Sequence, residues 1–207
     1  MPRSLSIDQI IEATLCGIEL SQKKYENWSG GCWLWEAPEY LITINVAENI
    51  AKLSGSKYLT LEHSAKYALE DAGAKTRGRL PHDIRELGRV DILLWWANET
   101  PRAIIEIKNQ IYTTDQYSRD IKRIKEFLKR KQTSSSIQFG LFAFYDSAYD
   151  GARKTAVEKI QDKIKTVKGN IREILGDAFY ISVKKSKIHQ VNGDAWVAGC
   201  VFIRLKS

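Results

Sequence analysis

The chain has 207 residues, of which 43% are hydrophobic and 10% aromatic, and it carries a formal net charge of +7. This is the composition of an ordinary globular protein with one well-buried core, and no apolar run approaches the roughly 20 residues that span a membrane. Three cysteines without a CxxC pair argue against a zinc site or a disulfide framework; with no signal-peptide pattern, they predict a soluble, cytoplasmic protein. The basic excess favours a polyanionic partner such as nucleic acid.

The N-terminal part of the chain predicts a helix followed by an aromatic loop. Residues 6–24 begin with a helix-start pattern, and apolar residues follow at helical spacing. The loop at 27–31 is surrounded by three tryptophans, Trp28, Trp33 and Trp35. They suit an aromatic plug that holds the first helix to the core, or a base-stacking platform for single-stranded nucleic acid. The same region is a candidate homodimer interface.

Two more helices and a basic segment are expected next. Pro38 precedes an apolar stretch that predicts a helix from Glu39 to near Gly55, and a further helix is predicted over residues 60–71. The expected core residues of the first of these helices are Leu41, Ile44, Val46 and Ile50. Residues 75–82 are basic and contain glycine and proline, which forbid a long regular element.

The most informative stretch is a predicted antiparallel hairpin. Its two apolar runs, residues 88–96 and 103–109, have strand length, and turn-forming residues lie between them. Because side chains alternate along a strand, Glu106 and Lys108 lie on one face of the sheet. Asp91 interrupts the first run, where an aspartate is unfavourable unless something nearby compensates for it.

A hard divalent cation would compensate for these acids. Asp91 and Glu106, with the carbonyl oxygen of Ile107, offer the oxygen ligands that Mg²⁺ accepts while it keeps several waters. Lys108 could then orient or activate an attacking water and offset charge on a phosphate, which predicts metal-dependent phosphodiester hydrolysis. The ordinary alternative is a solvated or ladder-paired Glu-x-Lys, which is frequent by chance in a chain with 28% charged residues.

Gly88-Arg89-Val90-Asp91 followed by Ile104-Ile105-Glu106-Ile107-Lys108 resembles the core of the PD-(D/E)xK nuclease superfamily. This restriction-endonuclease-like group includes type II restriction enzymes and archaeal Holliday-junction resolvases. The resemblance implies a mixed sheet flanked by helices, dependence on Mg²⁺ or Mn²⁺, and cleavage of DNA or, less often, RNA. It assigns metal binding to Asp91 and Glu106 and a catalytic role to Lys108. Val90 departs from the family's proline, and Asp120 departs from the Gln-x-x-x-Tyr motif of RecB-type nucleases.

The resemblance also implies a glutamate upstream, on a helix near the metal. Glu62, at the start of the predicted helix 60–71, is the best-placed match and is included among the catalytic residues. Glu39 and Glu70 compete with it. Glu48 is a further candidate, although for Glu39 and Glu48 a solvated helix face is the plainer expectation.

Basic residues near the hairpin are candidate phosphate contacts. Arg77 and Arg79 precede the hairpin, Arg89 opens it, and a helix predicted over residues 116–132 carries a basic face opposite its apolar one. The residues of that face expected to contact nucleic acid are Arg119, Lys122 and Arg123. A solvated loop and a solvated helix face are the alternatives.

The remaining elements complete a single α/β domain with a restriction-endonuclease-like mixed sheet. A buried strand is predicted at 137–145 beside the Glu106 strand, a helix at 152–175 with an interruption near Gly169, and strands at 178–183 and 196–205. Residues 60–145 are the expected core, 1–58 a helical N-terminal addition, and 146–207 a C-terminal helix with strands. The predicted function is a metal-dependent nuclease that hydrolyses phosphodiester bonds, in DNA before RNA; the alternative is a non-catalytic nucleic-acid-binding or assembly module of the same fold.

Overall fold

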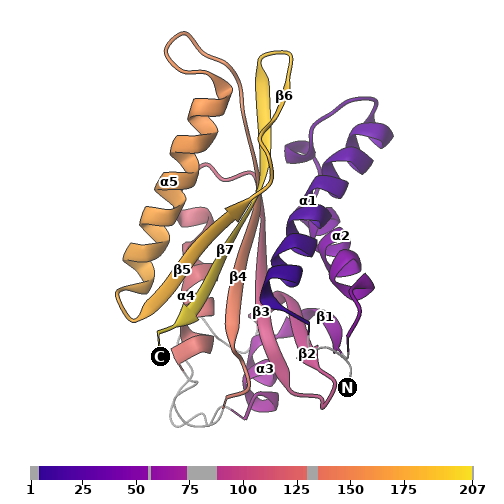
Figure 1. The fold of residues 1–207 in the computed structure, drawn as a ribbon, viewed down its shortest axis with the longest axis vertical. Coiled ribbons are helices and arrows are strands. Elements are labelled where there is room, and N and C mark those ends of the chain that lie inside the picture. The colour runs from indigo at the N-terminus through magenta and orange to yellow at the C-terminus, as the bar shows by residue number, and fades with distance from the viewer. Residues whose placement is uncertain (1–4, 56, 74–87, 130–134, 207) are drawn as a thin grey trace.

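A mixed β-sheet runs through the centre of the molecule, with helices on both faces (Figure 1). The computed structural model describes residues 5–55, 57–73, 88–129 and 135–206. The helices are α1 (Ile7–Ser29), η1 (Leu34–Glu36, a 3-10 turn), α2 (Glu39–Lys52), α3 (Ala65–Asp71), α4 (Asp115–Lys129) and α5 (Ala156–Leu175). Helices α1 and α2 cover one face of the sheet, and α4 and α5 the other. The architecture is therefore α/β, as predicted.

The sheet has seven strands in the order β1-β2-β3-β4-β7-β5, with β6 paired to β7. The strands are β1 (Lys57–Ser64), β2 (Arg89–Trp96), β3 (Pro101–Asn109), β4 (Phe139–Ala148), β5 (Phe179–Lys185), β6 (His189–Val191) and β7 (Asp194–Leu205). Strands β2 and β3 form the predicted antiparallel hairpin. Strands β3 and β4 are parallel, and α4 is the crossover between them. Helix α4 therefore lies over the strand that carries Glu106 and Lys108.

Helix starts follow local sequence signals. The Ser6 hydroxyl accepts a hydrogen bond from the Gln9 N–H, the Gln9 side chain accepts one from the Ser6 N–H, and α1 begins there as predicted. Thr155 and Glu158 form the same capping box at the start of α5. Helix α2 starts directly after Pro38, whose fixed φ suits a helix entry.

Alternating side chains divide the core into two layers. On β3, Ile104 belongs to the layer under α4 and α5, whereas Ile105 and Ile107 belong to the layer under α1 and α2. Glu106 and Lys108 alternate with the second group, so they share the α4 face. The segment predicted as an N-terminal addition, residues 1–58, supplies α1 and α2, which form one of these layers with the sheet.

Several sequence predictions about the elements are wrong. The helix predicted over 60–71 is strand β1 followed by α3, because residues 57–64 pair with β2. Ile44 is 44% exposed instead of buried, and α5 continues through Gly169 without interruption. Strand β6 was not expected from the sequence. Residues 27–29 lie in α1 and not in the predicted loop, and η1 was not expected from the sequence. The remaining elements were predicted with the correct type.

Among the described residues, no helix is both long enough and apolar enough to cross a membrane.

Candidate functional site

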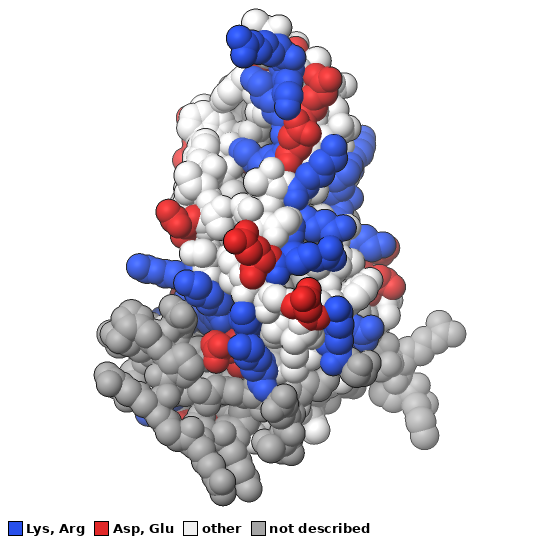
Figure 2. Space-filling model, turned by 90° about the vertical axis from the view of Figure 1, so that its left-hand side faces the viewer, with Lys and Arg blue, Asp and Glu red and all other residues white. Residues whose placement is uncertain are grey.

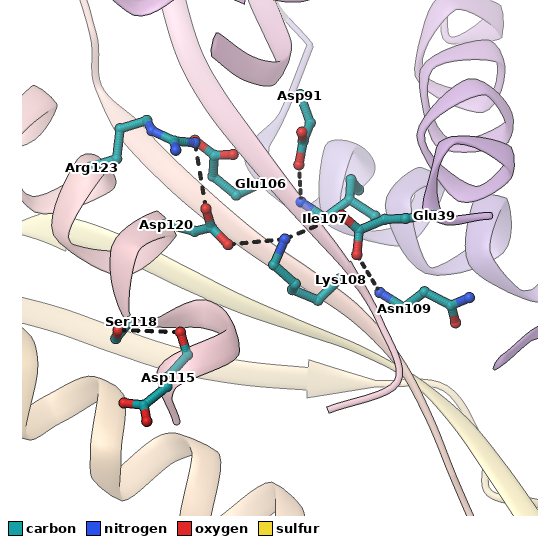
Figure 3. Close-up of polar contacts among 10 residues, drawn as sticks. All are labelled: Glu39, Asp91, Glu106, Ile107, Lys108, Asn109, Asp115, Ser118, Asp120 and Arg123. Atoms are coloured by element: carbon teal, nitrogen blue, oxygen red, sulfur yellow. Dashed lines mark hydrogen bonds and ion pairs between the residues drawn. The ribbon is translucent and has the colours of Figure 1, made fainter. Parts of the chain in front are cut away.

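The β2–β3 hairpin brings Asp91 next to Glu106. Ile92 pairs with Ile105 in this antiparallel hairpin, so Asp91, one residue before Ile92, lies opposite Glu106, one residue after Ile105. The Ile107 N–H donates a 2.6 Å hydrogen bond to Asp91 Oδ2, which holds this carboxylate against β3. Figure 3 shows both carboxylates beside the same stretch of β3. The predicted acid pair is therefore formed, while the role of the Ile107 carbonyl oxygen as a metal ligand stays a prediction.

Glu106 is buried and Asp91 is partly buried, and both resist ionisation. Burial raises the pKa of Asp91 to about 6, although the Ile107 hydrogen bond and the Lys108 charge oppose the rise. Glu106 is only 1% exposed, and burial raises its pKa well above the usual range. The Arg123 charge opposes that rise, and the negative charge of Asp91 adds to it. The positive charge near the two carboxylates is therefore too small to offset the effect of burial on their pKa values.

Arg123 supplies part of that charge. One guanidinium nitrogen donates a 2.8 Å hydrogen bond to Glu106 Oε1 and lies 3.5 Å from Asp120 Oδ1. The position of α4 over β3 explains this contact, because Asp120 and Arg123 are one turn apart on the helix. Arg123 was expected on an exposed basic face, but its side chain is 17% exposed and faces the site.

Lys108 lies between two carboxylates from different helices. Its Nζ is 3.1 Å from Glu39 Oε1 and 3.2 Å from Asp120 Oδ2 (Figure 3). Burial lowers the pKa of Lys108, but Asp120 and Glu39 outweigh burial and raise it above its usual value. Lys108 is therefore an ammonium ion at neutral pH. It can donate hydrogen bonds and stabilise negative charge, but it cannot accept a proton.

Asn109 fastens the end of β3 to the segment that contains η1. Its N–H donates a 2.8 Å hydrogen bond to Glu39 Oε2, and its side-chain amide donates to the carbonyl oxygens of Leu34 and Ala37, each at 2.8 Å. These contacts place Glu39, in the first turn of α2, beside Lys108. The cluster thus combines β2, β3, α2 and α4.

The donor set fits a hard divalent cation in chemical type. Asp91 and Glu106 are neighbouring carboxylates whose raised pKa values report unfavourable negative charge, which a cation would relieve. Within the residues that the structure describes, no group of three or more His, Cys, Asp or Glu side chains is arranged to hold a metal. Two carboxylates with water suffice for Mg²⁺, whereas Arg123 competes for Glu106 in this arrangement.

Of the four glutamates considered from the sequence, the structure brings Glu39 to the cluster. Glu62 lies in strand β1 and not at a helix start, and its φ of 50° is left-handed. Glu48 forms ion pairs with Lys24 and Lys52 on the surface, and Glu70 is exposed on α3. Glu62 was therefore the wrong choice for the acid on a helix near Lys108.

The predicted phosphate contacts have mixed positions. Arg77 and Arg79 lie outside the described residues. Arg89, Arg119 and Lys122 are exposed, as a surface contact requires. Figure 2 shows many lysine and arginine side chains on the side of the molecule formed by α5, with acidic side chains among them. Exposed members of α5 include Lys165, Lys168 and Arg172.

The sequence contained a signal for the missed residues of α4. Tyr117, Ile121 and Ile124 mark the buried stripe of this helix, and Asp120 falls within it at helical spacing. A charged residue in a buried stripe needs a partner, and Arg123 lies at the edge of that stripe. The sequence contained no such signal for the contacts of Glu39 with Lys108 and Asn109, because Glu39 is about 70 positions away from them in the chain.

Comparisons with known proteins add no assignment. No protein-family model matches the chain, and no curated protein or solved structure matches it.

Proposed function

We propose that the protein is a metal-dependent nuclease of the restriction-endonuclease-like PD-(D/E)xK type that hydrolyses phosphodiester bonds, in DNA rather than RNA. The observation that carries the proposal is the convergence of Asp91, Glu106 and Lys108 on one face of the β2–β3 hairpin. Burial of the two acids costs free energy because it disfavours their charged forms, and a site with a purely structural role would avoid this cost. Residues with pKa values perturbed in this way are concentrated at functional sites.

Each residue has a distinct part in the proposed reaction. Asp91 and Glu106 would hold Mg²⁺ or Mn²⁺, which when bound polarises the scissile phosphate and lowers the pKa of a water molecule. Lys108, held as an ammonium ion between Glu39 and Asp120, orients that water and stabilises negative charge on the phosphate. The Ile107 N–H fixes the Asp91 carboxylate, and Asn109 fixes Glu39.

Nucleic acid as the substrate is supported by charge. The chain has a net charge of +7, and Arg89, Arg119 and Lys122 are exposed on the hairpin and crossover helix that carry the cluster. Exposed basic residues can contact the phosphates along the nucleic-acid backbone. Such contacts position the nucleic acid but do not recognise its base sequence. The substrate contact is therefore expected to weaken steeply with salt.

A second candidate is a non-catalytic nucleic-acid-binding or assembly module. The observation that favours it is the set of ion pairs in the cluster, where Arg123 already neutralises Glu106 and Lys108 is already paired with Asp120 and Glu39. A cluster of this kind can exist without a metal. It would bind nucleic acid equally well with Mg²⁺ or EDTA and would not cut it.

The test is incubation of the purified protein with supercoiled plasmid, linear duplex and single-stranded DNA, each with Mg²⁺, Mn²⁺ or EDTA. The proposal expects metal-dependent cutting that falls at least about 100-fold in Lys108→Ala, a loss of the size seen for charge-stabilising groups. Lys187→Ala is the matched control, since Lys187 is exposed between β5 and β6, outside the cluster and apart from the expected phosphate contacts. Binding without cutting under every condition would replace the proposal with the second candidate.

A further inference from the structure

An open pocket lies beyond the Asn109 end of the proposed site and has no part in the reaction described above. It has a volume of about 300 Å³, and its walls include Trp33, Trp35, Tyr149, Glu36 and Asp194. Gly30 and Gly31, with φ of 74° and 114°, turn the chain back after α1 and complete the wall. A volume of this size is at the small end of ligand sites and is sufficient for one planar ring system.

The aromatic side chains of the pocket are available to a ligand. Tyr149 is 52% exposed and Trp35 is 39% exposed, although large aromatic residues are usually buried. The rings of Trp33 and Tyr149 are nearly parallel, with an interplanar angle of 22° and a centroid distance of 6.4 Å. The sequence left open whether the tryptophans form a plug or a stacking surface. Trp33 is partly buried against the layer under α1 and α2, as a plug would be, whereas Trp35 and Tyr149 are exposed and can serve as a stacking surface.

The lining chemistry restricts the class of ligand. Glu36 and Asp194 are acids without a basic side chain in the lining, so a phosphate group would be repelled. A carboxylate accepts hydrogen bonds, and adenine, cytosine and guanine carry exocyclic amino groups that donate them, whereas thymine has none. Aromatic rings stack on the faces of all bases.

The pocket is close enough to the cluster for one nucleic-acid strand to reach both. Asn109, next to Lys108, binds carbonyl oxygens in η1 and directly after it, and η1 contributes Trp35 and Glu36 to the pocket. Tyr149 lies seven residues beyond Phe142, the β4 partner of Glu106, which corresponds to about 23 Å of extended chain, a span of several nucleotides. Arg153 is exposed in the loop that carries Tyr149, where a strand's phosphates could meet positive charge, whereas the neighbouring Lys154 is paired with Asp162.

We propose that this pocket binds one unpaired nucleobase carrying an exocyclic amino group, on the same strand as the phosphodiester that the Asp91 cluster cleaves and several nucleotides away from it. The inference rests on the proposed function and narrows its substrate to single-stranded or locally unpaired nucleic acid. The base stacks on the aromatic side chains, and Glu36 or Asp194 accepts a hydrogen bond from its amino group. Such pockets read a base that has left the helix stack.

The experiment measures binding alone, so it does not depend on catalysis. Fluorescence anisotropy of labelled dC, dA and dT 12-mers and of a duplex is recorded with the full chain in EDTA. The 12-mers of dC and dA should bind about tenfold more tightly than dT, as expected for one hydrogen bond to a charged acceptor. Glu36→Ala should reduce this preference.

Aromatic variants provide matched comparisons. Tyr149→Ala and Trp35→Ala should each weaken dC 12-mer binding about tenfold, the usual effect of losing one stacking partner. Trp28→Ala and Tyr67→Ala are the controls, because these side chains are 69% and 58% exposed and lie outside the pocket lining. Thermal unfolding of all four variants shows whether the fold is retained.

Three results would overturn the inference. The first is equal affinity for dC, dA and dT, and the second is an equal effect of the pocket and control variants. The third is a protein that binds none of the oligonucleotides but whose tryptophan fluorescence is quenched by tetramethylammonium. That result would identify the pocket as an aromatic site for organic cations instead. If the pocket variants bind DNA as well as the control variants do while cutting still depends on Lys108, the pocket inference is wrong and the proposed function stands. If the pocket binds bases as expected but no DNA is cut, the proposed function is wrong and the pocket inference stands.

Discussion

Replacement of Asp91 by asparagine should stabilise the metal-free protein at high pH. The carboxylate is partly buried, and its pKa is raised from 3.8 to about 6, chiefly by burial. In Asp91→Asn the new side chain would keep an oxygen for the Ile107 N–H but would carry no charge. The substitution therefore removes the unfavourable ionisation while retaining the hydrogen bond.

The size of the effect follows from the pKa difference between the folded and unfolded chains. Between pH 4 and 6 the folded protein binds the Asp91 proton more tightly than the unfolded chain does, so the free energy of unfolding falls as pH rises. Above pH 6 the loss is complete and amounts to about 3 kcal/mol, at about 1.36 kcal/mol per pH unit. The Asp91→Asn protein should match the wild type at pH 4 and exceed it by up to about 3 kcal/mol at pH 8.

The assay is urea unfolding of both proteins in EDTA at pH 4, 5, 6, 7 and 8. The difference between the two free energies isolates residue 91, because most other titrating groups are common to both proteins. Asp177→Asn is the control, since Asp177 is exposed in the turn after α5. A difference that is the same at every pH, or an Asp91→Asn protein that is less stable than the wild type at pH 8, would refute the assigned burial of this charge.

Three other substitutions test the contacts around the site and between the helices. Arg123→Met should lower the free energy of unfolding at pH 8 by roughly 3 kcal/mol, because it leaves Glu106 buried and unpaired. Gly17→Ala should cost about 2 kcal/mol, since a Cβ there would lie 2.5 Å from Val46 Cα. Ser6→Ala removes the α1 cap at a cost of about 1 kcal/mol. All three are measured by urea unfolding.

Matched variants separate these effects from general damage. Lys122→Met changes an exposed cation on the same helix as Arg123 and should alter stability by less than about 0.5 kcal/mol. Gly169→Ala fills open space on α5 and should stabilise the protein by up to about 1 kcal/mol. An Arg123→Met protein as stable as Lys122→Met, or a Gly17→Ala protein as stable as Gly169→Ala, would contradict the packing described here.

The hairpin was predictable because its signals are local. Strand-length apolar runs, a turn between them and strict alternation determine that Glu106 and Lys108 share a face, and the structure has this arrangement. The helix starts at Ser6 and Thr155 are also set by residues within one turn. These features need no knowledge of the rest of the fold.

The errors arose where distant residues decide the structure. The segment from residue 57 to 64 contains residues that suit a helix, but pairing with β2 and burial of Leu59 and Leu61 make it a strand. The choice of Glu62 followed from that error. Glu39 joins the cluster through Lys108 and the Asn109 N–H, which are about 70 positions away in the chain.

Binding of a divalent cation tests the central claim most directly, because it needs no knowledge of the substrate. Isothermal titration calorimetry of Mn²⁺ or Mg²⁺ into the wild type, Asp91→Asn and Asp177→Asn at pH 8 compares the proposed ligand with an exposed acid. The account predicts saturable binding in the wild type and Asp177→Asn that is lost in Asp91→Asn. Absence of binding in the wild type, or equal binding in Asp91→Asn, would contradict a metal-dependent site at Asp91 and Glu106.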